Sequence, residues 1–514
     1  MTTASSAFSG GKQAALDPPA PATQLRREFT LWSSFAFAFA FISPIVALYG
    51  IYALALTAAG PGFVWNFLIV FVGQLFVAAV FAELVSRWPI EGSVYQWAGR
   101  LLGRPAGWFA GWTYLWTLMV AMAVVALSAG GFLCNVIGIG QPSNAQKVGL
   151  SFVILALGTA ANLVGRKALR IFMTASIVAE VVGSVGLGTW LLLFHRKHGL
   201  GFLFHGTGAS TGWHYLSGPF LLTMAFVGFS FVGFESAGSI AEEVQEPRRH
   251  LPKAVLFSLT CVAVVVTYSA IAITLAVPDL GAVVSGSDTD PVTTTLTTAL
   301  GSNITRPLEL LFVIGFTASF LALQTSASRI LWSYARDRAL PFSASLSRLS
   351  TSERIPVWGV GVTFVVGSVV FLLSIVQTDL YSVLVNFVSG GFFLAFLFPL
   401  VGAVLARVTG RWSPGPWQLG RVGAVVAVVA TLWAAFQFLN ISWPQQAYPH
   451  WYLNWSFYLV AAVLGVVGVV LYRARAAGIT LYEIPDDETS YPAPDASATR
   501  SAAARSAVQL DGTR

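Results

Sequence analysis

The groups of this chain that could do chemistry within a membrane are a few polar residues inside long apolar segments. Glu180 lies in the segment 168–194, roughly 18 Å from its start at about 1.5 Å per helical residue. Glu235 lies within a second apolar segment, MAFVGFSFVGFESAGSIAEEV. A carboxyl group at the membrane centre costs roughly 2.5 to 3.5 kcal/mol to insert. Each therefore needs a functional reason, such as facing a cavity or binding a proton, or a structural partner.

Two of the apolar segments contain residues that interrupt a helix. Pro44, which follows Ser43 in AFAFAFISPIVALYGIYALAL, lacks an N–H and disfavours a helical conformation at the preceding residue. The second segment has Gly228, Gly233 and Gly238 at intervals of five. An opened backbone survives in a membrane only where it lines a cavity or is buried in protein. Two broken helices are therefore predicted, although a simple packing kink stays an alternative for each.

The composition indicates a polytopic membrane protein with an all-α fold. Of the 514 residues, 56% are hydrophobic and only 10% are charged, whereas soluble domains carry about 25% charged residues. Apolar runs recur at the length that a hydrocarbon layer of about 30 Å requires. We predict twelve spans at 31–58, 62–86, 106–138, 147–165, 168–194, 219–245, 253–277, 307–334, 357–376, 380–407, 419–440 and 453–472.

The distribution of basic residues predicts the orientation of these spans. With the N-terminus in the cytoplasm, four of the 29 Lys and Arg residues face outside, namely Lys147, Arg196, Lys197 and Arg306, as the positive-inside rule requires. Both termini are then cytoplasmic, in a plasma or inner membrane. Residues 1–28 and 473–514 are expected to be disordered cytoplasmic tails that flank the transmembrane domain 29–472. The stretch 92–102 is amphipathic and is expected to lie along the inner membrane face.

The positions of the two interrupted helices suggest an internal repeat. They are the first and sixth spans, which correspond if helices 1–5 (31–194) and helices 6–10 (219–407) are two halves. After an odd number of spans the second half must insert upside down. This five-plus-five inverted repeat is typical of secondary transporters with a site at the bilayer midplane, and helices 11–12 (419–472) lie outside it.

Other chemistry finds no support in the sequence. Cys134 and Cys261 stand singly in apolar runs, and the spacing of the four clustered histidines matches no closed metal site; these are His195, His198, His205 and His214. No hydrolase, zinc-protease or ATP-binding motif occurs. We expect no cofactor, no metal ion, no nucleic acid partner and no enzymatic activity, so that transport runs on a gradient or by exchange.

Several segments resemble the amino acid–polyamine–organocation (APC) superfamily of permeases. The residues that carry the resemblance are FSFVGFESAG (229–238) with EEVQEPRRHLPKAV (242–255), SRILWSYARDRALP (328–341) and AELVSRWPIEGSVYQWAGRLLG (82–103). The resemblance covers spans 1 to 10 and implies the inverted-repeat fold with helices 1 and 6 broken.

The resemblance also implies where the substrate binds. It places the substrate between two sets of residues, Ser43, Pro44, Ile45 and Val46 on helix 1, and Phe229, Ser230, Phe231, Val232 and Gly233 on helix 6. Phe229 matches the aromatic residue that caps the substrate. Half-helix ends offer carbonyls to an ammonium group and N–H groups to a carboxylate. Family members that bind an α-carboxylate commonly have Gly-Ser-Gly in helix 1, whereas this chain has Ser43-Pro44-Ile45, which weakens the α-amino-acid assignment.

Coupling roles are assigned to the two buried carboxyl groups. In proton-coupled relatives a lysine stands fifteen residues after the glycine that precedes helix 5, and counting from Gly165 leads to Glu180. A proton carried by Glu180 is the first choice, and sodium bound with Thr325 or Ser326 is the second. Glu235 is expected to couple site occupancy to gating, with a structural helix cap as the alternative.

The sequence thus predicts a secondary active permease for an amino acid or small amine, acting as a proton symporter. A choline-like or polyamine-like organic cation carrier or exchanger is the alternative within transport. A non-transporting nutrient sensor and a membrane enzyme are the alternatives from other classes.

Overall fold

We describe a computed structural model of the chain. The residues that it describes are 27–139, 142–206, 212–351, 353–376, 380–444 and 450–481. The chain divides into two units, Met1–Ile479 and Thr480–Arg514, and the first unit is described below. Most of the two predicted disordered tails, 1–26 and 482–514, lies outside the described residues. Residues 473–478 were predicted to be disordered, but they continue the last span as a helix.

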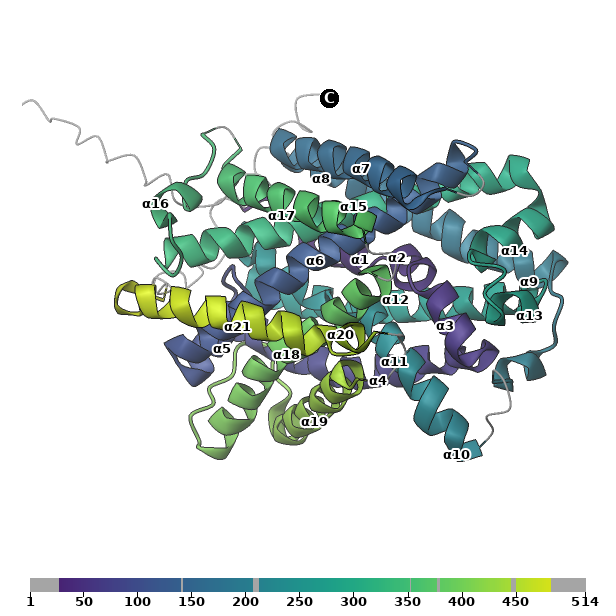
Figure 1. The fold of residues 1–514 in the computed structure, drawn as a ribbon. Coiled ribbons are helices and arrows are strands. Elements are labelled where there is room, and N and C mark those ends of the chain that lie inside the picture. The colour runs from purple at the N-terminus through teal and green to yellow at the C-terminus, as the bar shows by residue number, and fades with distance from the viewer. Residues whose placement is uncertain are drawn as a thin grey trace, which may run out of the picture. The chain divides into compact units, whose positions relative to one another are not determined.

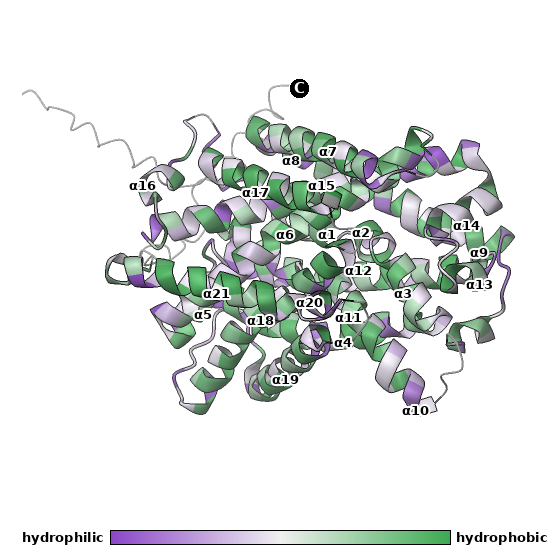
Figure 2. Ribbon diagram, viewed as in Figure 1, coloured by the Kyte–Doolittle hydropathy of each residue, from purple (hydrophilic) through white to green (hydrophobic). Residues whose placement is uncertain are grey.

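Twelve helices of the described chain are long and apolar enough to cross a membrane, which confirms the predicted all-α fold and the number of spans. The long helices run side by side (Figure 1) and are predominantly hydrophobic along their length (Figure 2). The spans are Leu31–Tyr49, Pro61–Arg87, Arg104–Val136, Asn144–Val164, Lys167–Phe194, Gly212–Glu243, Pro247–Ala276, Ser302–Arg336, Val357–Ile375, Leu380–Val408, Gly420–Ser442 and Ser456–Gly478.

Both predicted breaks are present. The first span consists of α1 (Leu31–Ile42) and α2 (Pro44–Tyr49), separated by Ser43. The second break lies between η5 (Phe229–Phe231) and η6 (Phe234–Glu243), because Val232 is extended and Gly233 has a left-handed conformation. The inverted relation of the two five-helix halves stays a prediction.

The remaining spans are mostly single helices. Span 5 is the exception, because α8 (Arg166–Glu180) and α9 (Leu187–Phe194) are joined by a π-helical turn, η2 (Val181–Gly186). The single helices are α4 (Trp65–Arg87), α6 (Arg104–Val136), α7 (Asn144–Val164), α12 (Pro247–Ala276), α15 (Ser302–Arg336), α17 (Val357–Val376), α18 (Leu380–Val408), α19 (Gly423–Ser442) and α21 (Ser456–Arg475). The sixth span begins with α10 (Gly212–Tyr215), η4 (Leu216–Phe220) and α11 (Leu221–Gly228).

The core of the domain is built on the first, third and eighth spans. In its most apolar stretch α15 is 83% buried, whereas α21 at the end of the unit is only 11% buried. α15 packs along α6, and α1 packs against α12 and α15. The broken first span is therefore enclosed by protein, as an interrupted backbone in a membrane requires.

The amphipathic stretch 92–102 does not lie along the membrane surface as expected. It forms α5 (Val94–Leu102), whose Tyr95 and Trp97 side chains are almost fully buried. The reason is close packing, because a Cβ added at Gly107 of α6 would stand 2.5 Å from the Gly99 Cα atom. With two glycines facing each other, α5 approaches α6 closely and becomes part of the protein interior.

Candidate substrate and coupling site

The break in helix 1 is formed by a buried Ser-Pro pair. Ser43 has φ 48° and ψ 114°, and its hydroxyl oxygen accepts the N–H of Val46 at 3.3 Å, so it caps α2. The four residues predicted on helix 1, Ser43, Pro44, Ile45 and Val46, are all buried. They form one side of the predicted substrate site.

Glu180, at the end of α8, reaches this break and is 1% exposed. One carboxylate oxygen accepts the hydroxyl of Ser43. The other accepts the backbone N–H of Ile45 at 3.0 Å and the hydroxyl of Ser184 at 3.2 Å. The chain then enters η2, and π-helical turns of this kind are frequent at functional sites. Glu180 thus contacts two of the predicted substrate-binding residues directly.

The break in helix 6 lies against the break in helix 1. The hydroxyl of Ser230 donates to the carbonyl of Ala47 in α2 at 2.5 Å. The side-chain amide of Gln74 in α4 donates to the carbonyl of Phe231 at 3.0 Å. All five predicted residues on this helix are buried, namely Phe229, Ser230, Phe231, Val232 and Gly233. The structure therefore brings the two predicted sets of residues together.

Glu235 lies just beyond this second break and is fully buried. One carboxylate oxygen accepts the hydroxyl of Tyr114 in α6 at 2.8 Å, and the other accepts the N–H of Gly233 at 2.9 Å. Glu235 therefore bonds the residue that precedes the second half of helix 6 and ties it to α6. The Glu235 side chain thus links the helix-6 break to the third span.

Thr325 and Ser326, which were considered for a sodium site, are hydrogen-bonded to other residues. Thr325 donates to the amide oxygen of Asn162 at 2.8 Å, and the Ser326 hydroxyl lies 2.8 Å from that of Ser239. Within the described chain neither is hydrogen-bonded to Glu180. Sodium binding by Glu180 together with these hydroxyl groups stays a prediction.

A large cavity opens on the face of the membrane domain opposite to the one where the first span begins. It has a volume of about 1040 Å³ and is called the vestibule below. Its lining comes from spans 1, 3, 4, 9 and 10 and from the loop 278–294, and includes Tyr49, Gly50, Ser128, Phe132, Asn135, Lys147, Asp279, Asp288, Asp290 and Tyr381. None of the nine predicted substrate-binding residues lines it.

Tyr49 stands between the vestibule and Glu180. Its side chain lines the vestibule, and its hydroxyl donates to the carbonyl of Gly183, three residues beyond Glu180, at 3.2 Å. The Tyr49 ring stacks on Phe312 of α15 with a centroid separation of 4.2 Å. Tyr49 therefore connects the vestibule lining to η2, the turn that follows Glu180.

The vestibule residues were not predicted from the sequence, although some of them lie in recognisable sequence patterns. Tyr49 and Gly50 directly follow the broken segment that had been identified. Asp290 precedes Pro291 and accepts the N–H of Thr293 at 3.2 Å, a recognisable helix-capping pattern. Tyr381, whose hydroxyl donates to the carbonyl of Gly50 at 2.8 Å, has no comparable sequence signal.

The face on which the first span begins is closed. The N–H groups of Glu28 and Phe29 both donate to the carbonyl of Glu243 at 2.9 Å, so the segment before α1 is fixed to the end of η6. Arg329 of α15 donates to the Glu243 carboxylate at 3.0 Å, and both side chains are buried. These contacts hold the starts or ends of the first, sixth and eighth spans together on this face, which is called the closed face below.

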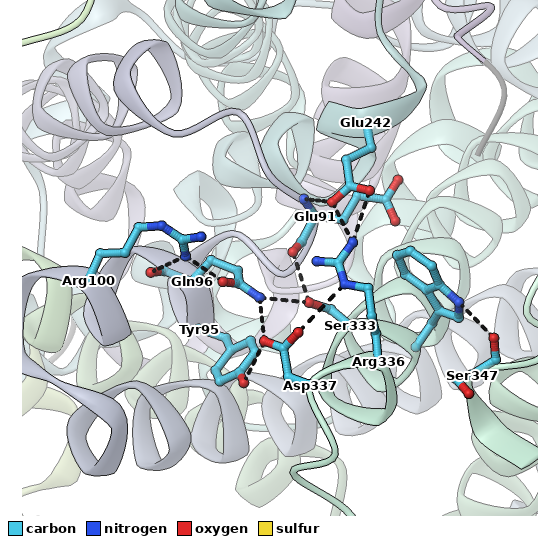
Figure 3. A network of polar contacts seen from close by, with 10 residues as sticks. Glu91, Tyr95, Gln96, Arg100, Glu242, Ser333, Arg336, Asp337 and Ser347 are labelled. Carbon is cyan, nitrogen blue, oxygen red and sulfur yellow. Dashed lines mark hydrogen bonds and ion pairs between the residues drawn. The ribbon is translucent and has the colours of Figure 1, made fainter. Parts of the chain in front are cut away.

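A polar network extends this closed face around α5 (Figure 3). Asp337 accepts hydrogen bonds from the Tyr95 hydroxyl and the Gln96 amide, each at 2.9 Å. Arg336 donates to both carboxylate oxygens of Glu242, at 2.8 and 3.0 Å. The network in Figure 3 therefore joins three elements on this face, namely α5, η6 and the end of α15.

Glu91 is the exceptional member of this network. It lies between the second span and α5 and is fully buried, yet neither carboxyl oxygen has a hydrogen-bond partner among the described residues. Burial, together with the nearby carboxylates of Glu243 and Glu242, raises the pKa of Glu91 well above its usual range, against the opposing effect of Arg329 and Arg336. Glu91 is therefore best accommodated in this closed state as the neutral acid.

Replacing Glu91 with glutamine is expected to remove a pH dependence of stability. Because the folded-state pKa is raised, the stability due to neutral Glu91 is present at low pH and is lost as pH rises through that pKa, by up to about 1.4 kcal/mol per pH unit. Thermal unfolding of purified protein should be measured from about pH 5 to about pH 8. Over this range the melting temperature of wild type should fall relative to that of Glu91→Gln. The half-exposed Glu246 provides the control Glu246→Gln. Parallel wild-type and Glu91→Gln profiles would show that Glu91 is already ionised.

Comparisons with known proteins agree with this architecture. Residues 29–469 match the family described as amino acid permease. An uncharacterized amino-acid permease of Schizosaccharomyces pombe is 25% identical, covering 80% of this chain and 78% of that protein. The branched-chain amino acid permease BcaP of Bacillus subtilis is 27% identical, covering 83% of this chain and 89% of that protein. The family match over most of the chain, together with the twelve spans, shows that this protein belongs to the amino acid permeases of the APC superfamily and is a membrane transporter of amino acids.

Proposed function

We propose that this permease is a proton-coupled importer that binds its substrate between the breaks of helices 1 and 6. The working membrane is a plasma or inner membrane, with both termini in the cytoplasm and the vestibule facing outside. The observation that carries the proposal is the contact of Glu180 with Ser43 and Ile45 at the helix-1 break. A group that binds a proton there changes the hydrogen bonds of the substrate site itself.

The contacts of Glu180 indicate how a proton would act. The oxygen facing Ile45 accepts a backbone N–H, which can only donate. A proton therefore enters on the oxygen facing Ser43 and reverses that hydrogen bond, so the hydroxyl of Ser43 must find another acceptor. Since the same hydroxyl oxygen caps Val46, protonation of Glu180 alters the start of α2.

Glu235 supplies the proposed link from occupancy to gating. Its carboxylate joins the N–H of Gly233, at the helix-6 break, to the hydroxyl of Tyr114 in α6. The carbonyl of Glu235 also accepts the hydroxyl of Ser93, next to α5 and the closed face, at 3.3 Å. A substrate that moves the break would thus act on both neighbouring elements.

Transport in proteoliposomes with imposed gradients tests the proposed coupling. Purified wild-type protein should accumulate a radiolabelled amino acid when the outside is made acidic, with no requirement for sodium. Dissipating the pH gradient with a protonophore should return the internal concentration to equilibrium. Uptake that follows a sodium gradient and ignores pH would contradict proton coupling.

Replacing Phe229 with alanine tests the proposed position of the substrate. Phe229 lies in η5 at the break and is 7% exposed, and we propose that it covers the bound substrate. The substitution should raise the apparent KM for uptake about tenfold or uncouple transport, while the protein still folds. Binding and uptake like those of wild type would place the substrate elsewhere.

A further inference from the structure

A small pocket lies on the closed face, where three spans meet. Successive spans run in opposite directions, so the ends of α4 and α18 and the start of α19 share the face on which the first span begins. The pocket has a volume of about 240 Å³ and is called the arginine pocket below. Its charged lining residues are Glu83, Arg407 and Arg421, and its lining also includes Trp412. Two arginines against one glutamate give the lining a positive balance.

The negative charge of Glu83 is already compensated within the protein. One carboxylate oxygen is paired with Arg407, and the side chains of Glu83 and Arg407 are 2% and 9% exposed. The other oxygen accepts the N–H of Leu419 at 2.8 Å. The Arg407 guanidinium lies over the Trp412 ring, 4.2 Å from its centroid. These contacts build the wall of the pocket and leave Glu83 little charge with which to repel an anion.

Arg421 carries the positive charge that is not compensated. It lies in η7 (Gly420–Val422), directly before α19, and its side chain is exposed. No carboxylate of the described chain forms an ion pair with it. The start of a helix carries a partial positive charge and offers N–H groups to anions, and an arginine binds a phosphate through paired N–H groups. Arg421 and the start of α19 therefore suit a phosphate group.

The surface beside the arginine pocket is apolar. Val408, Val422 and Val425 are 78%, 58% and 66% exposed. Val408 follows Arg407 in the chain, and Val422 follows Arg421. Trp412, in the pocket itself, is of a residue type that is enriched at the level of lipid head groups. A phosphate site bordered by exposed apolar side chains fits a ligand that has an anionic head and apolar chains.

We propose that the arginine pocket binds an anionic phospholipid from the leaflet on the closed face. Arg421 and the start of α19 hold its phosphate, and its acyl chains lie along Val422 and Val425. Basic pockets between transmembrane helices bind head groups of this kind. A free phosphate ion shares the charge but leaves the exposed valines uncovered. Because the pocket joins three spans, the bound lipid stabilises the folded protein.

Thermal unfolding of the purified full-length protein in a neutral detergent tests the inference. Dioleoylphosphatidylglycerol is compared with dioleoylphosphatidylcholine, which has the same acyl chains but a zwitterionic head group. Phosphatidylglycerol should raise the melting temperature in a saturable manner, with a midpoint at a concentration at least about fivefold lower than that of phosphatidylcholine. Equal midpoints for the two lipids, or no shift with phosphatidylglycerol, would overturn the inference.

Two arginine variants assign the effect to the pocket. Arg421→Gln should need about fivefold more phosphatidylglycerol to reach the half-maximal shift, because it removes one positive charge near the membrane surface. Arg473→Gln is the matched control, because Arg473 is exposed in the last turn of α21, on the same face but outside the lining of the pocket. This control should keep the wild-type midpoint. Equal weakening in both variants would show that total charge, and not this pocket, attracts the lipid.

Inorganic phosphate distinguishes a lipid from a free ion. Phosphate at the concentrations at which the lipid saturates its shift should leave the melting temperature unchanged. A shift by phosphate alone that is lost in Arg421→Gln would assign the pocket to a soluble anion and overturn the lipid proposal. The wild-type comparison of the two lipids decides the inference even if Arg421→Gln fails to fold. No measurement here needs a substrate or an ion gradient, so the result is independent of proton coupling.

Discussion

Replacing Gly233 with alanine is expected to abolish transport and to lower the amount of folded protein severely. Gly233 has φ 108°, a conformation that L-residues rarely adopt. A Cβ atom here would stand 2.3 Å from Cδ1 and 2.4 Å from Cε1 of Phe41, so the ring of α1 would have to move. Left-handed backbone alone costs roughly 1 to 2 kcal/mol, and the clash at the contact between the two broken helices adds to it.

The measurement is uptake in proteoliposomes together with the yield and melting temperature of purified protein. Gly149→Ala in α7 is the matched control, because a Cβ added there meets no atom within 4 Å. That control should be at least as stable as wild type, since alanine favours helix. Normal uptake by Gly233→Ala would mean that the helix-6 break is not held against α1 as described.

Replacing Arg329 with methionine should strongly destabilise the closed face. The Arg329 and Glu243 side chains are 5% and 1% exposed. Removing one partner of a buried ion pair costs roughly 3 to 5 kcal/mol, because the other charge loses its compensation. Since the Glu243 carbonyl also fixes Glu28 and Phe29, opening of this face is expected to become easier.

Thermal unfolding of three variants checks this prediction. Arg329→Met should lower the melting temperature clearly, and Arg329→Met combined with Glu243→Gln should recover part of the loss. Arg249→Met is the matched control, because its ion pair with Glu246 is exposed and 3.6 Å long, and exposed pairs contribute about 0 to 1 kcal/mol. Equal melting temperatures for the Arg329 and Arg249 variants would contradict the importance of the buried pair.

The spans could be predicted from the sequence because the bilayer demands long apolar runs. The first span was predicted to end at 58, but it ends at Tyr49. The largest errors in where the spans begin lie at prolines. The sixth, seventh and eighth spans were predicted to begin at 219, 253 and 307, whereas they begin at Gly212, Pro247 and Ser302. Pro219, Pro252 and Pro307 lie inside these helices, near their starts. A proline near a helix start loses few intrahelical hydrogen bonds, so it does not have to mark the first residue.

The candidate site could be predicted only in part. Ser43-Pro44 and the glycines around Glu235 are local signals for an interrupted helix, and both breaks exist. The contact of Glu180 with Ile45 joins residues 135 positions apart, and no local pattern predicts which donor a buried carboxylate reaches. The vestibule escaped prediction for the same reason, because its lining comes from five spans and a loop.

The region around Glu91 shows a second limit of prediction from the sequence. The sequence around it indicates an amphipathic surface stretch, and the hydrophobic pattern of α5 fits that interpretation. Burial of Tyr95 and Trp97 depends on the facing glycines Gly99 and Gly107, and this contact appears only when α5 and α6 are placed together. Small residues at a helix contact are common in membrane proteins, but their partners cannot be read from one segment.

We propose that a proton on Glu180 drives accumulation at the site between the broken helices. The direct test is Glu180→Gln in proteoliposomes with a pH gradient of one unit, which supports up to about tenfold accumulation for one coupled proton. Wild type and the control Glu246→Gln should accumulate labelled substrate, whereas Glu180→Gln should only equilibrate it and should still exchange it with unlabelled substrate inside. Accumulation by Glu180→Gln in response to the pH gradient would contradict the account.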